Sequence, residues 1–296
     1  MTTSSTKTTF SADPYASRLA EKWEAVERVD PVIWNDRYAG PLDRKQLDRF
    51  QQDGLLSIEQ LVGTDEAHEL LATAKRLAAE ANPNDESIVM EPGGGAVRSI
   101  FRVHRTNERF RALCGDSRLV EVARQILGSD VYIHQSRINF KPGFTGKEFF
   151  WHSDFETWHM EDGMPRMRAL SMSLSLTANH LFNGPLMLVP GSHRTYLRCA
   201  GETPDHHYRS SLKKQEYGVP SRDALRLLIE RSDGIQAATG SPGSAILFDC
   251  NTMHGSVANL SPDDRTNLFV VFNSIENKLV EPFGGKPPRP AFLAER

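Results

Sequence analysis

A histidine and an aspartate two positions apart, His152 and Asp154, have the clearest chemical potential in this sequence. On an extended strand, residues i and i+2 point to the same face, so the imidazole and the carboxylate would lie side by side. Two histidines and one carboxylate on one face of an ion form the facial triad that binds Fe(II), and this pair supplies two of the three ligands. Zinc accepts the same side chains, so the pair by itself leaves the identity of the metal open.

The third ligand should be a distant histidine on a facing strand, and His254 is the best candidate. It follows a β-rich run over residues 245–248 and a short turn. A trio of ligands on one face leaves three positions open, enough for a bidentate 2-oxo acid and for O₂. Asp249, within the turn, is interpreted as a turn residue rather than a ligand. Four further histidines are interpreted as surface residues or as residues behind the ligands: His159, His180, His206 and His207.

A dicarboxylic 2-oxo acid also needs a cation for its far carboxylate, and Arg265 is the candidate. Arg265 follows His254 by eleven residues and begins a β-rich run that ends at Phe272. A hairpin at this point would return Arg265 toward the metal, and its guanidinium can bind a carboxylate through two charge-assisted hydrogen bonds. The choice of iron over zinc therefore rests on Arg265 and on the 2-oxo acid that it would bind.

These side chains belong to the second half of the chain, where short β-rich runs dominate. Residues 169–176 alternate strictly between small polar and large apolar side chains, which is typical of a strand between a packed core and a polar cavity or solvent. Strands are expected over residues 131–140, 169–176, 186–189, 244–248 and 267–272, with a polar, helical insertion over residues 205–231. No repeat and no alternation of strands with helices is present. The pattern predicts an α+β chain whose second half is an antiparallel sandwich or barrel.

The first half carries helical patterns and capping residues. Asp43 is an expected N-cap and Gly54 an expected helix end, and Asp116 and Gly128 bound a second helix in the same way. Helices are expected over residues 14–27, 44–50, 65–81 and 119–127, and a glycine-rich loop over residues 91–95.

Composition excludes several classes of partner. The 35 basic and 38 acidic residues give a net charge of −3, so nothing favours nucleic acid or an anionic membrane as the main partner. No apolar run is long enough to span a bilayer, and the polar amino-terminal residues lack the core of a signal peptide. The three cysteines, Cys114, Cys199 and Cys250, are too few for a disulfide framework or a CxxC zinc site. We therefore expect a cytoplasmic protein with reduced thiols.

Together, His152-x-Asp154, His254 and Arg265 resemble the phytanoyl-CoA dioxygenase superfamily of Fe(II)- and 2-oxoglutarate-dependent oxygenases. The stretch Gly-Pro-Leu over residues 184–186, followed by Pro-Gly-Ser-His over residues 190–193, adds to that resemblance. It implies a double-stranded β-helix (jelly-roll) core with amino-terminal helices and helical insertions. It also implies Fe(II) as the metal, with 2-oxoglutarate and O₂ as co-substrates.

A more specific signature is FWHSDFETWH over residues 150–159, continued by EDGMP over residues 161–165, which closely resembles that of the ectoine hydroxylases. The similarity extends from about Tyr15 to the last residue. It implies hydroxylation of ectoine, a small zwitterion, to 5-hydroxyectoine, with release of succinate and CO₂, in compatible-solute synthesis under osmotic stress. The near-neutral net charge of the chain is compatible with a zwitterionic substrate, and the family suggests a homodimer.

Polar side chains at alternate positions of the run after Gly128 share one face: Gln135, Arg137, Asn139 and Lys141. The residues alone leave open whether this face lines a substrate barrel or is a solvated sheet face. The resemblance implies that Gln135 contacts ectoine and that Lys141 helps to bind 2-oxoglutarate. Arg137 is a candidate for the ectoine carboxylate, and Asn139 for a co-substrate carboxylate or a backbone group.

Trp158 and Thr157 follow Asp154 closely. The resemblance suggests that Trp158 packs on the ectoine ring while Thr157 hydrogen-bonds it, and the alternative for Trp158 is ordinary core packing. By the same resemblance, aromatic side chains complete the lining: Phe101, Phe248 and Phe269. Phe248 is the one best supported by the residues alone, because it ends a strand six residues before His254.

We expect a single oxygenase domain over residues 14–296, after a disordered tail over residues 1–13. Residues 14–128 would be mainly helical support and lid, and residues 129–296 the jelly-roll core. Two alternatives remain: a relative that hydroxylates another small zwitterion, and a cupin-like binding module that retains the metal without turnover. The signature over residues 151–165 argues against the first, and the ligand trio with Arg265 argues against the second.

Overall fold

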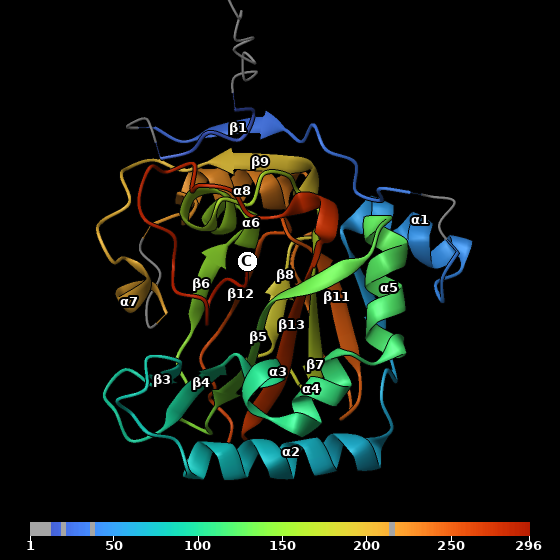
Figure 1. The fold of residues 1–296 in the computed structure, drawn as a ribbon, viewed down its shortest axis with the longest axis vertical. Coiled ribbons are helices and arrows are strands. Elements are labelled where there is room, and N and C mark those ends of the chain that lie inside the picture. The colour runs from blue at the N-terminus through green and yellow to red at the C-terminus, as the bar shows by residue number, and fades with distance from the viewer. Residues whose placement is uncertain (1–12, 19–21, 36–38, 213–216) are drawn as a thin grey trace, which may run out of the picture.

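Two antiparallel sheets pack face to face at the centre of the molecule (Figure 1). The larger sheet has seven strands, in the order β2 (Leu55–Ile58), β11 (Ala245–Asp249), β7 (Ala169–Ser175), β13 (Arg265–Ser274), β5 (Val131–Lys141), β4 (Val97–Phe101) and β3 (Ile88–Met90). The smaller has four: β10 (Gln236–Ala237), β8 (Leu186–Leu188), β12 (His254–Ser256) and β6 (Phe149–His152). The computed structural model describes residues 13–18, 22–35, 39–212 and 217–296.

Helices cover the outer face of the larger sheet. They are α1 (Arg44–Asp53), α2 (Thr64–Ala79), α3 (Val103–Thr106), α4 (Glu108–Cys114) and α5 (Ser117–Leu127). Their apolar side chains form one cluster with Leu170, Met172 and Leu174 of β7. In Figure 1, α2 runs across the lower end of the strands and α5 stands along one side of them. The α+β class and the antiparallel two-sheet arrangement expected from the sequence are confirmed.

Shorter elements connect the strands of the second half. They are α6 (Asp154–Thr157), a π-helix (Trp158–Asp162), a 3-10 turn (Ser192–Arg194), α7 (Tyr208–Ser211), α8 (Arg222–Glu230) and a second 3-10 turn (Ile275–Asn277). The helices α7 and α8 lie in the insertion expected over residues 205–231. None of the helices in the described part of the chain is both long and apolar enough to cross a bilayer. The tail expected over residues 1–13 lies outside the described residues, apart from Asp13.

The five strands expected from the sequence correspond to β5, β7, β8, β11 and β13, to within two residues at either end. The alternation in β7 has the predicted cause. Leu170, Met172 and Leu174 pack on the helices, whereas Ser171 on the opposite face donates a hydrogen bond of 3.3 Å to Asp154 Oδ2. The polar face of β7 therefore lines the interior between the two sheets.

The helix expected over residues 14–27 is wrong. Residues 24–27 form β1 (Glu24–Glu27), which pairs with β9 (Thr195–Arg198) in a separate two-stranded sheet. Trp23 and Ala25 pack on one apolar cluster and Val26 on another, so the apolar side chains alternate as in a strand. Partners far along the chain decided the structure of this segment over its local helical spacing. Residues 19–21 lie outside the described residues.

Helix α1 has the caps that its sequence predicts. Asp43 accepts a hydrogen bond of 2.8 Å from the backbone N–H of Gln46, and the Gln46 side chain accepts one of 2.9 Å from Asp43 N–H. Gly54 ends the helix in the left-handed region, with φ of 70°, and its N–H donates to Phe50 O.

Replacing Asp43 with alanine is expected to lower the free energy of unfolding by about 1 kcal/mol, because the backbone N–H of Gln46 loses its acceptor. Urea denaturation followed by circular dichroism measures the change. Asp48→Ala is the matched control: this residue lies on the exposed face of the same helix, in an i,i+4 pair with Arg44. Equal stability of the Asp43→Ala and Asp48→Ala proteins would contradict the role of the cap.

Candidate active site

His152, Asp154 and His254 meet where β6 and β12 lie side by side. His152 and His254 face each other across these antiparallel strands, with ring centroids 4.3 Å apart. Asp154 Oδ1 lies 3.6 Å from His152 Nε2, and its Oδ2 lies 3.8 Å from His254 Nε2. One donor atom from each residue lies within 4.8 Å of the others, and all three residues are buried. The structure thus brings together the trio expected from the sequence.

Backbone carbonyls orient both imidazoles. His152 Nδ1 lies 2.7 Å from Phe150 O, and His254 Nδ1 lies 2.9 Å from Thr252 O. Because a carbonyl oxygen only accepts hydrogen bonds, each Nδ1 must carry the proton. Each Nε2 then turns a lone pair toward the point between the three side chains, as a histidine ligand to a metal does.

The pKa values of His254 and Asp154 are also compatible with metal binding. Burial, with His152 nearby, lowers the pKa of His254 to about 4, so its imidazole is neutral at pH 7. Burial alone would raise the pKa of Asp154, but His254 and His152 outweigh it and hold that pKa well below its usual range. Two imidazoles and one carboxylate are a donor set that fits a divalent iron ion.

Asp154 lies just beyond β6, as the first residue of α6. The sequence-based expectation placed it on the strand itself. Ser153 between the two ligands keeps an extended conformation, with φ of −104° and ψ of 130°, so His152 and Asp154 still face the same side.

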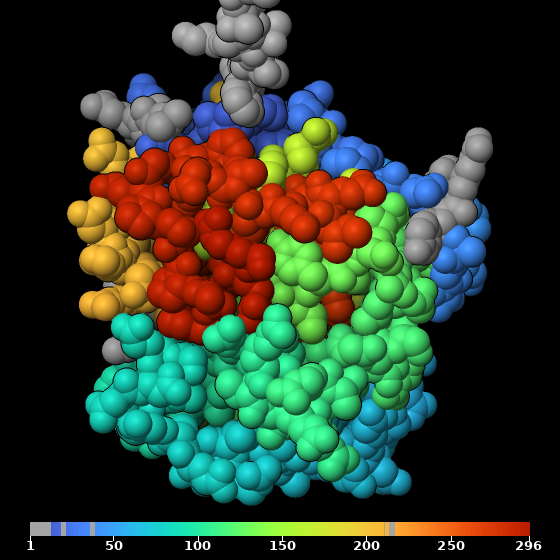
Figure 2. All heavy atoms as spheres, viewed as in Figure 1, coloured from blue at the N-terminus to red at the C-terminus, as the bar shows by residue number. Residues whose placement is uncertain are grey.

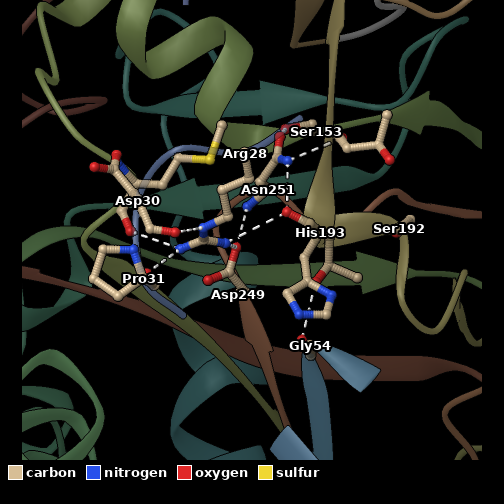
Figure 3. A network of polar contacts seen from close by, with 12 residues as sticks. Arg28, Asp30, Pro31, Gly54, Ser153, Ser192, His193, Asp249 and Asn251 are labelled. Atoms are coloured by element: carbon tan, nitrogen blue, oxygen red, sulfur yellow. Dashed lines mark hydrogen bonds and ion pairs between the residues drawn. The ribbon is translucent and has the colours of Figure 1, made fainter. Parts of the chain in front are cut away.

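A polar network behind the trio joins the two ligand-bearing segments (Figure 3). Ser153 donates a hydrogen bond of 2.9 Å to Asn251 Oδ1, in the turn before His254. Asp249 in the same turn accepts from Asn251 N–H at 2.8 Å and pairs with Arg28 at 2.8 Å. Asp249 therefore stabilises the turn and pairs with Arg28, and it is not one of the three metal ligands.

Two buried cations, Lys141 and Arg265, lie side by side at the paired ends of β5 and β13. Lys141 Nζ donates to Ser256 Oγ at 2.7 Å and to Val257 O at 2.6 Å, which are neutral acceptors. Within the described part of the chain, Arg265 Nε and Nη1 have no acceptor. A bound carboxylate would supply what both groups lack, so the residues fit a dicarboxylic co-substrate.

Burial and the repulsion of neighbouring cations lower the pKa values of this pair. Burial, followed by repulsion from Arg265 and Arg98, lowers the pKa of Lys141 to about 6. Burial, with Arg98 nearby, lowers the pKa of Arg265 to about 10, so its guanidinium still carries its charge at pH 7.

A pocket opens beside the ligand trio on the side of Trp158. Six of the expected co-substrate and substrate residues line it, together with His152 and Asp154: Phe101, Gln135, Arg137, Asn139, Thr157 and Trp158. The Arg137 guanidinium donates to Gln135 Oε1 at 2.8 Å and lies 5.0 Å from the centre of the Phe269 ring. Three residues on the polar face of β5, Gln135, Arg137 and Asn139, therefore line a cavity.

Two other expected residues, Phe248 and Phe269, have different surroundings. Phe248 and Phe269 belong to the apolar cluster between the two sheets, and the Phe248 ring centre lies 4.9 Å from that of His254. Asn139 Oδ1 accepts a hydrogen bond of 2.8 Å from Ser99 Oγ. Trp158 is buried against an apolar cluster and also lines the pocket, so packing and contact with a ligand are compatible.

Comparison with known proteins agrees with this geometry. Residues 50–267 match the phytanoyl-CoA dioxygenase family (PhyH). The ectoine dioxygenase of Sphingopyxis alaskensis is 52% identical over 286 residues, which cover 96% of this chain and 93% of that protein. The ectoine dioxygenase of Stutzerimonas stutzeri is 50% identical over 287 residues, covering 96% and 95%. The crystal structure of EctD from S. alaskensis with 2-oxoglutarate and 5-hydroxyectoine superposes with a TM-score of 0.85, at 47% identity and 96% and 95% coverage.

The chain belongs to the ectoine dioxygenases of the phytanoyl-CoA dioxygenase family. The family resemblance and the jelly-roll core expected from the sequence are thereby confirmed. The pocket has further lining residues that were not predicted from the sequence: Ser99, Phe149, Glu161, His207, Ser211, Leu212 and Arg289. Glu161 lies inside the signature over residues 150–165, so the sequence could have indicated it as a site residue. No local pattern indicated Arg289, because its partner Asp162 lies 127 positions earlier in the chain.

Proposed function

We propose that this ectoine dioxygenase hydroxylates ectoine to 5-hydroxyectoine, with Fe(II) as the metal and 2-oxoglutarate and O₂ as co-substrates. The match to the EctD structure with 2-oxoglutarate and 5-hydroxyectoine carries this proposal. A second EctD structure, with bound Fe, matches with a TM-score of 0.82 at 45% identity. The ligand trio and the two buried cations are the parts of this chain that the reaction requires.

His152, Asp154 and His254 would hold the iron through two Nε2 atoms and one carboxylate. When bound, iron couples the oxidative decarboxylation of 2-oxoglutarate to oxygen transfer, with succinate and CO₂ as the co-products. The contribution of the chain is to fix the ligands, orient both substrates and exclude water. Carbonyl-bound Nδ1 atoms and the Ser153–Asn251 hydrogen bond hold the ligands before any metal arrives.

Lys141 and Arg265 would bind the 5-carboxylate of 2-oxoglutarate. Arg265 has unused donors for a two-point contact, and Lys141 adds a point charge beside them. Asn139 lies two positions before Lys141 on the same face of β5. The hydrogen bond from the Ser99 hydroxyl uses only part of the hydrogen-bonding capacity of the Asn139 amide. Asn139 is therefore kept as a further co-substrate contact.

The substrate half of the pocket suits a small zwitterion. Arg137 offers a cation for the ectoine carboxylate, and Trp158 offers an aromatic face for the delocalised ring cation. Gln135 and Thr157 are placed to hydrogen-bond the ring, and Phe101 adds apolar surface. Phe248 and Phe269 would support the lining from behind, next to His254 and Arg137.

Replacing Trp158 with alanine is expected to raise the KM for ectoine about tenfold, because the ring cation loses an aromatic surface in a desolvated site. The KM for 2-oxoglutarate should change less than twofold, since Lys141 and Arg265 are untouched. Steady-state kinetics with each substrate varied in turn gives both constants. Trp34→Ala, at a half-buried tryptophan that contacts Arg168 away from the pocket, is the matched control. An unchanged KM for ectoine would assign Trp158 to core packing alone.

The proposed function is tested by ectoine-dependent release of succinate under air with added Fe(II). Formation of 5-hydroxyectoine, followed by mass spectrometry, should match the succinate formed. Succinate release that needs a different small zwitterion would favour a relative of altered specificity. Metal and 2-oxoglutarate binding without any turnover would favour a non-catalytic module.

We further propose that the enzyme is a cytoplasmic homodimer with one oxygenase domain over residues 14–296. Three buried free thiols, Cys114, Cys199 and Cys250, are compatible with a reducing compartment. Strands β2, β3 and β4 from before residue 128 join the sheet that carries the site, which supports one domain. Light scattering coupled to size-exclusion chromatography tests the dimer, and a mass equal to one chain of 33.2 kDa would contradict it.

A further inference from the structure

The end of the chain packs beside the substrate pocket, and Arg289 lines that pocket. Figure 1 places the carboxy terminus in front of β6 and β12, and Figure 2 shows the last residues at the surface there. We call residues 289–296 the carboxy-terminal strap. Its contacts reach three of the elements that line the substrate pocket.

The first contact fixes Gln135. Its Nε2 donates a hydrogen bond of 2.6 Å to Leu293 O, while its Oε1 accepts one of 2.8 Å from Arg137. Both ends of the amide are therefore oriented before a substrate arrives. One N–H and one oxygen lone pair remain for a ligand. Leu293 itself is fully buried and packs with Phe101 and Val89, so its carbonyl has little freedom.

The second contact fixes the π-helix that begins with Trp158. Arg289 donates to both oxygens of Asp162, at 2.8 and 2.6 Å, and Asp162 is the last residue of that helix. Arg296 donates to Asp162 O at 3.0 Å. Both Arg289 and Asp162 are buried, so the pair acts in an environment where its attraction is weakly screened.

The third contact anchors the strap itself. Glu295 pairs with Arg102 at 2.9 Å and with Arg105 at 3.4 Å, and its backbone N–H donates to His134 O at 2.9 Å. Arg102 directly follows Phe101, which is part of the pocket wall. Among the strap residues, Glu295 alone combines side-chain ion pairs with a backbone hydrogen bond to β5.

We propose that the carboxy-terminal strap, anchored by Glu295, is the element that positions Gln135 and Trp158 for ectoine. Glu295 and Leu293 are positioning residues: they act through Gln135 and do not touch the reacting atoms. The inference rests on the proposed function, since it names what orients the substrate-binding side chains of that same site.

The effect of loosening the strap follows from the Gln135 hydrogen bonds. Without Leu293 O, a buried amide N–H loses its acceptor and the side chain is free to turn away from the substrate. Ectoine binding should weaken about five- to tenfold, the equivalent of about one hydrogen bond. The Lys141–Arg265 end of the barrel has no contact with the strap among the described hydrogen bonds, so 2-oxoglutarate binding should be unaffected.

The test uses Glu295→Gln, which removes the charge and keeps the shape, and Glu295→Asp, which restores the charge. Calorimetry on the protein with Fe(II) and 2-oxoglutarate, without O₂, gives the Kd for ectoine apart from turnover. We expect the Kd to rise about five- to tenfold in Glu295→Gln and to recover at least partly in Glu295→Asp. Succinate formed per 5-hydroxyectoine should also rise, because a misplaced substrate leaves part of the decarboxylation uncoupled.

Two further proteins complete the test. Glu69→Gln removes an exposed ion pair with Arg109 far from the pocket and should leave the Kd unchanged. Removal of residues 292–296 deletes Leu293 and Glu295 together and should match or exceed the effect of Glu295→Gln. An ectoine Kd within twofold of wild type in either folded strap variant would overturn the inference. A lower melting temperature with an unchanged Kd has the same meaning, because it assigns the strap to stability alone.

Failure of the proposed function has a different signature. In that case the wild-type protein itself would release no succinate when ectoine is added. If wild type is active and the strap variants keep its Kd, only the role of the strap is wrong.

Discussion

Replacing Asp154 with alanine should remove iron and hydroxylation together. Loss of a partner that only orients a ligand typically lowers metal affinity or activity 10- to 100-fold, so loss of the ligand itself should exceed about 100-fold. Iron content after dialysis, measured by mass spectrometry, and 5-hydroxyectoine formation should fall in parallel. The physical reason is that the two imidazoles that remain carry no negative charge, so neither offsets the charge of a divalent ion.

The two histidines should not compensate for the missing carboxylate. His152 and His254 are held by Phe150 O and Thr252 O, so their rings cannot shift freely toward another ligand arrangement. Asp263→Asn is a suitable control because it removes one carboxylate from an exposed pair with His180 and leaves the trio intact. Full iron loading and full turnover of the Asp154→Ala protein would refute the assignment of the metal site.

The sequence was most informative where chemistry and local geometry coincide. The spacing of His152 and Asp154 put both side chains on one face, and a single extended residue, Ser153, is enough to preserve that relation although a helix starts at Asp154. The alternation in β7 predicted which residues face the helices and which face the barrel. These patterns depend on periods of two residues, so they survive small errors in strand boundaries.

The failures concern partners that are distant in the chain. Val26 and its neighbours have helical spacing, but the hydrogen bonds of β9, about 170 residues later, make a strand. Arg28 pairs with Asp249 at a separation of 221 residues, and Gln135 donates to Leu293 at a separation of 158. No local pattern encodes such contacts. The carboxy-terminal strap was therefore invisible in a sequence whose metal ligands could be identified.

Replacing Arg265 with alanine is expected to have the second large effect, on the KM for 2-oxoglutarate. The KM for 2-oxoglutarate should rise about 100-fold, because removing one partner of a buried, charge-assisted contact costs 2–5 kcal/mol. The KM for ectoine should change less than threefold, since Arg137, Gln135 and Trp158 line a pocket whose wall does not include Arg265. Arg265→Lys should be intermediate, because lysine keeps the charge and loses the two-point geometry. Arg109→Ala, at an exposed arginine paired with Glu69, removes the same charge and should leave both constants unchanged.

The dependence on pH gives a second, independent signature of the same contact. The pKa of Lys141 is about 6, so binding of a carboxylate at pH 7–8 must draw a proton onto the Lys141 amine. The 2-oxoglutarate KM of the wild type should therefore rise as the pH rises from 6 to 8. Burial is the largest cause of the low pKa and Arg265 is the second, so Arg265→Ala should raise the pKa of Lys141 and move the onset of this rise to higher pH. A 2-oxoglutarate KM independent of pH over this range in wild type, or the same onset in both proteins, would show that Lys141 and Arg265 do not share the carboxylate.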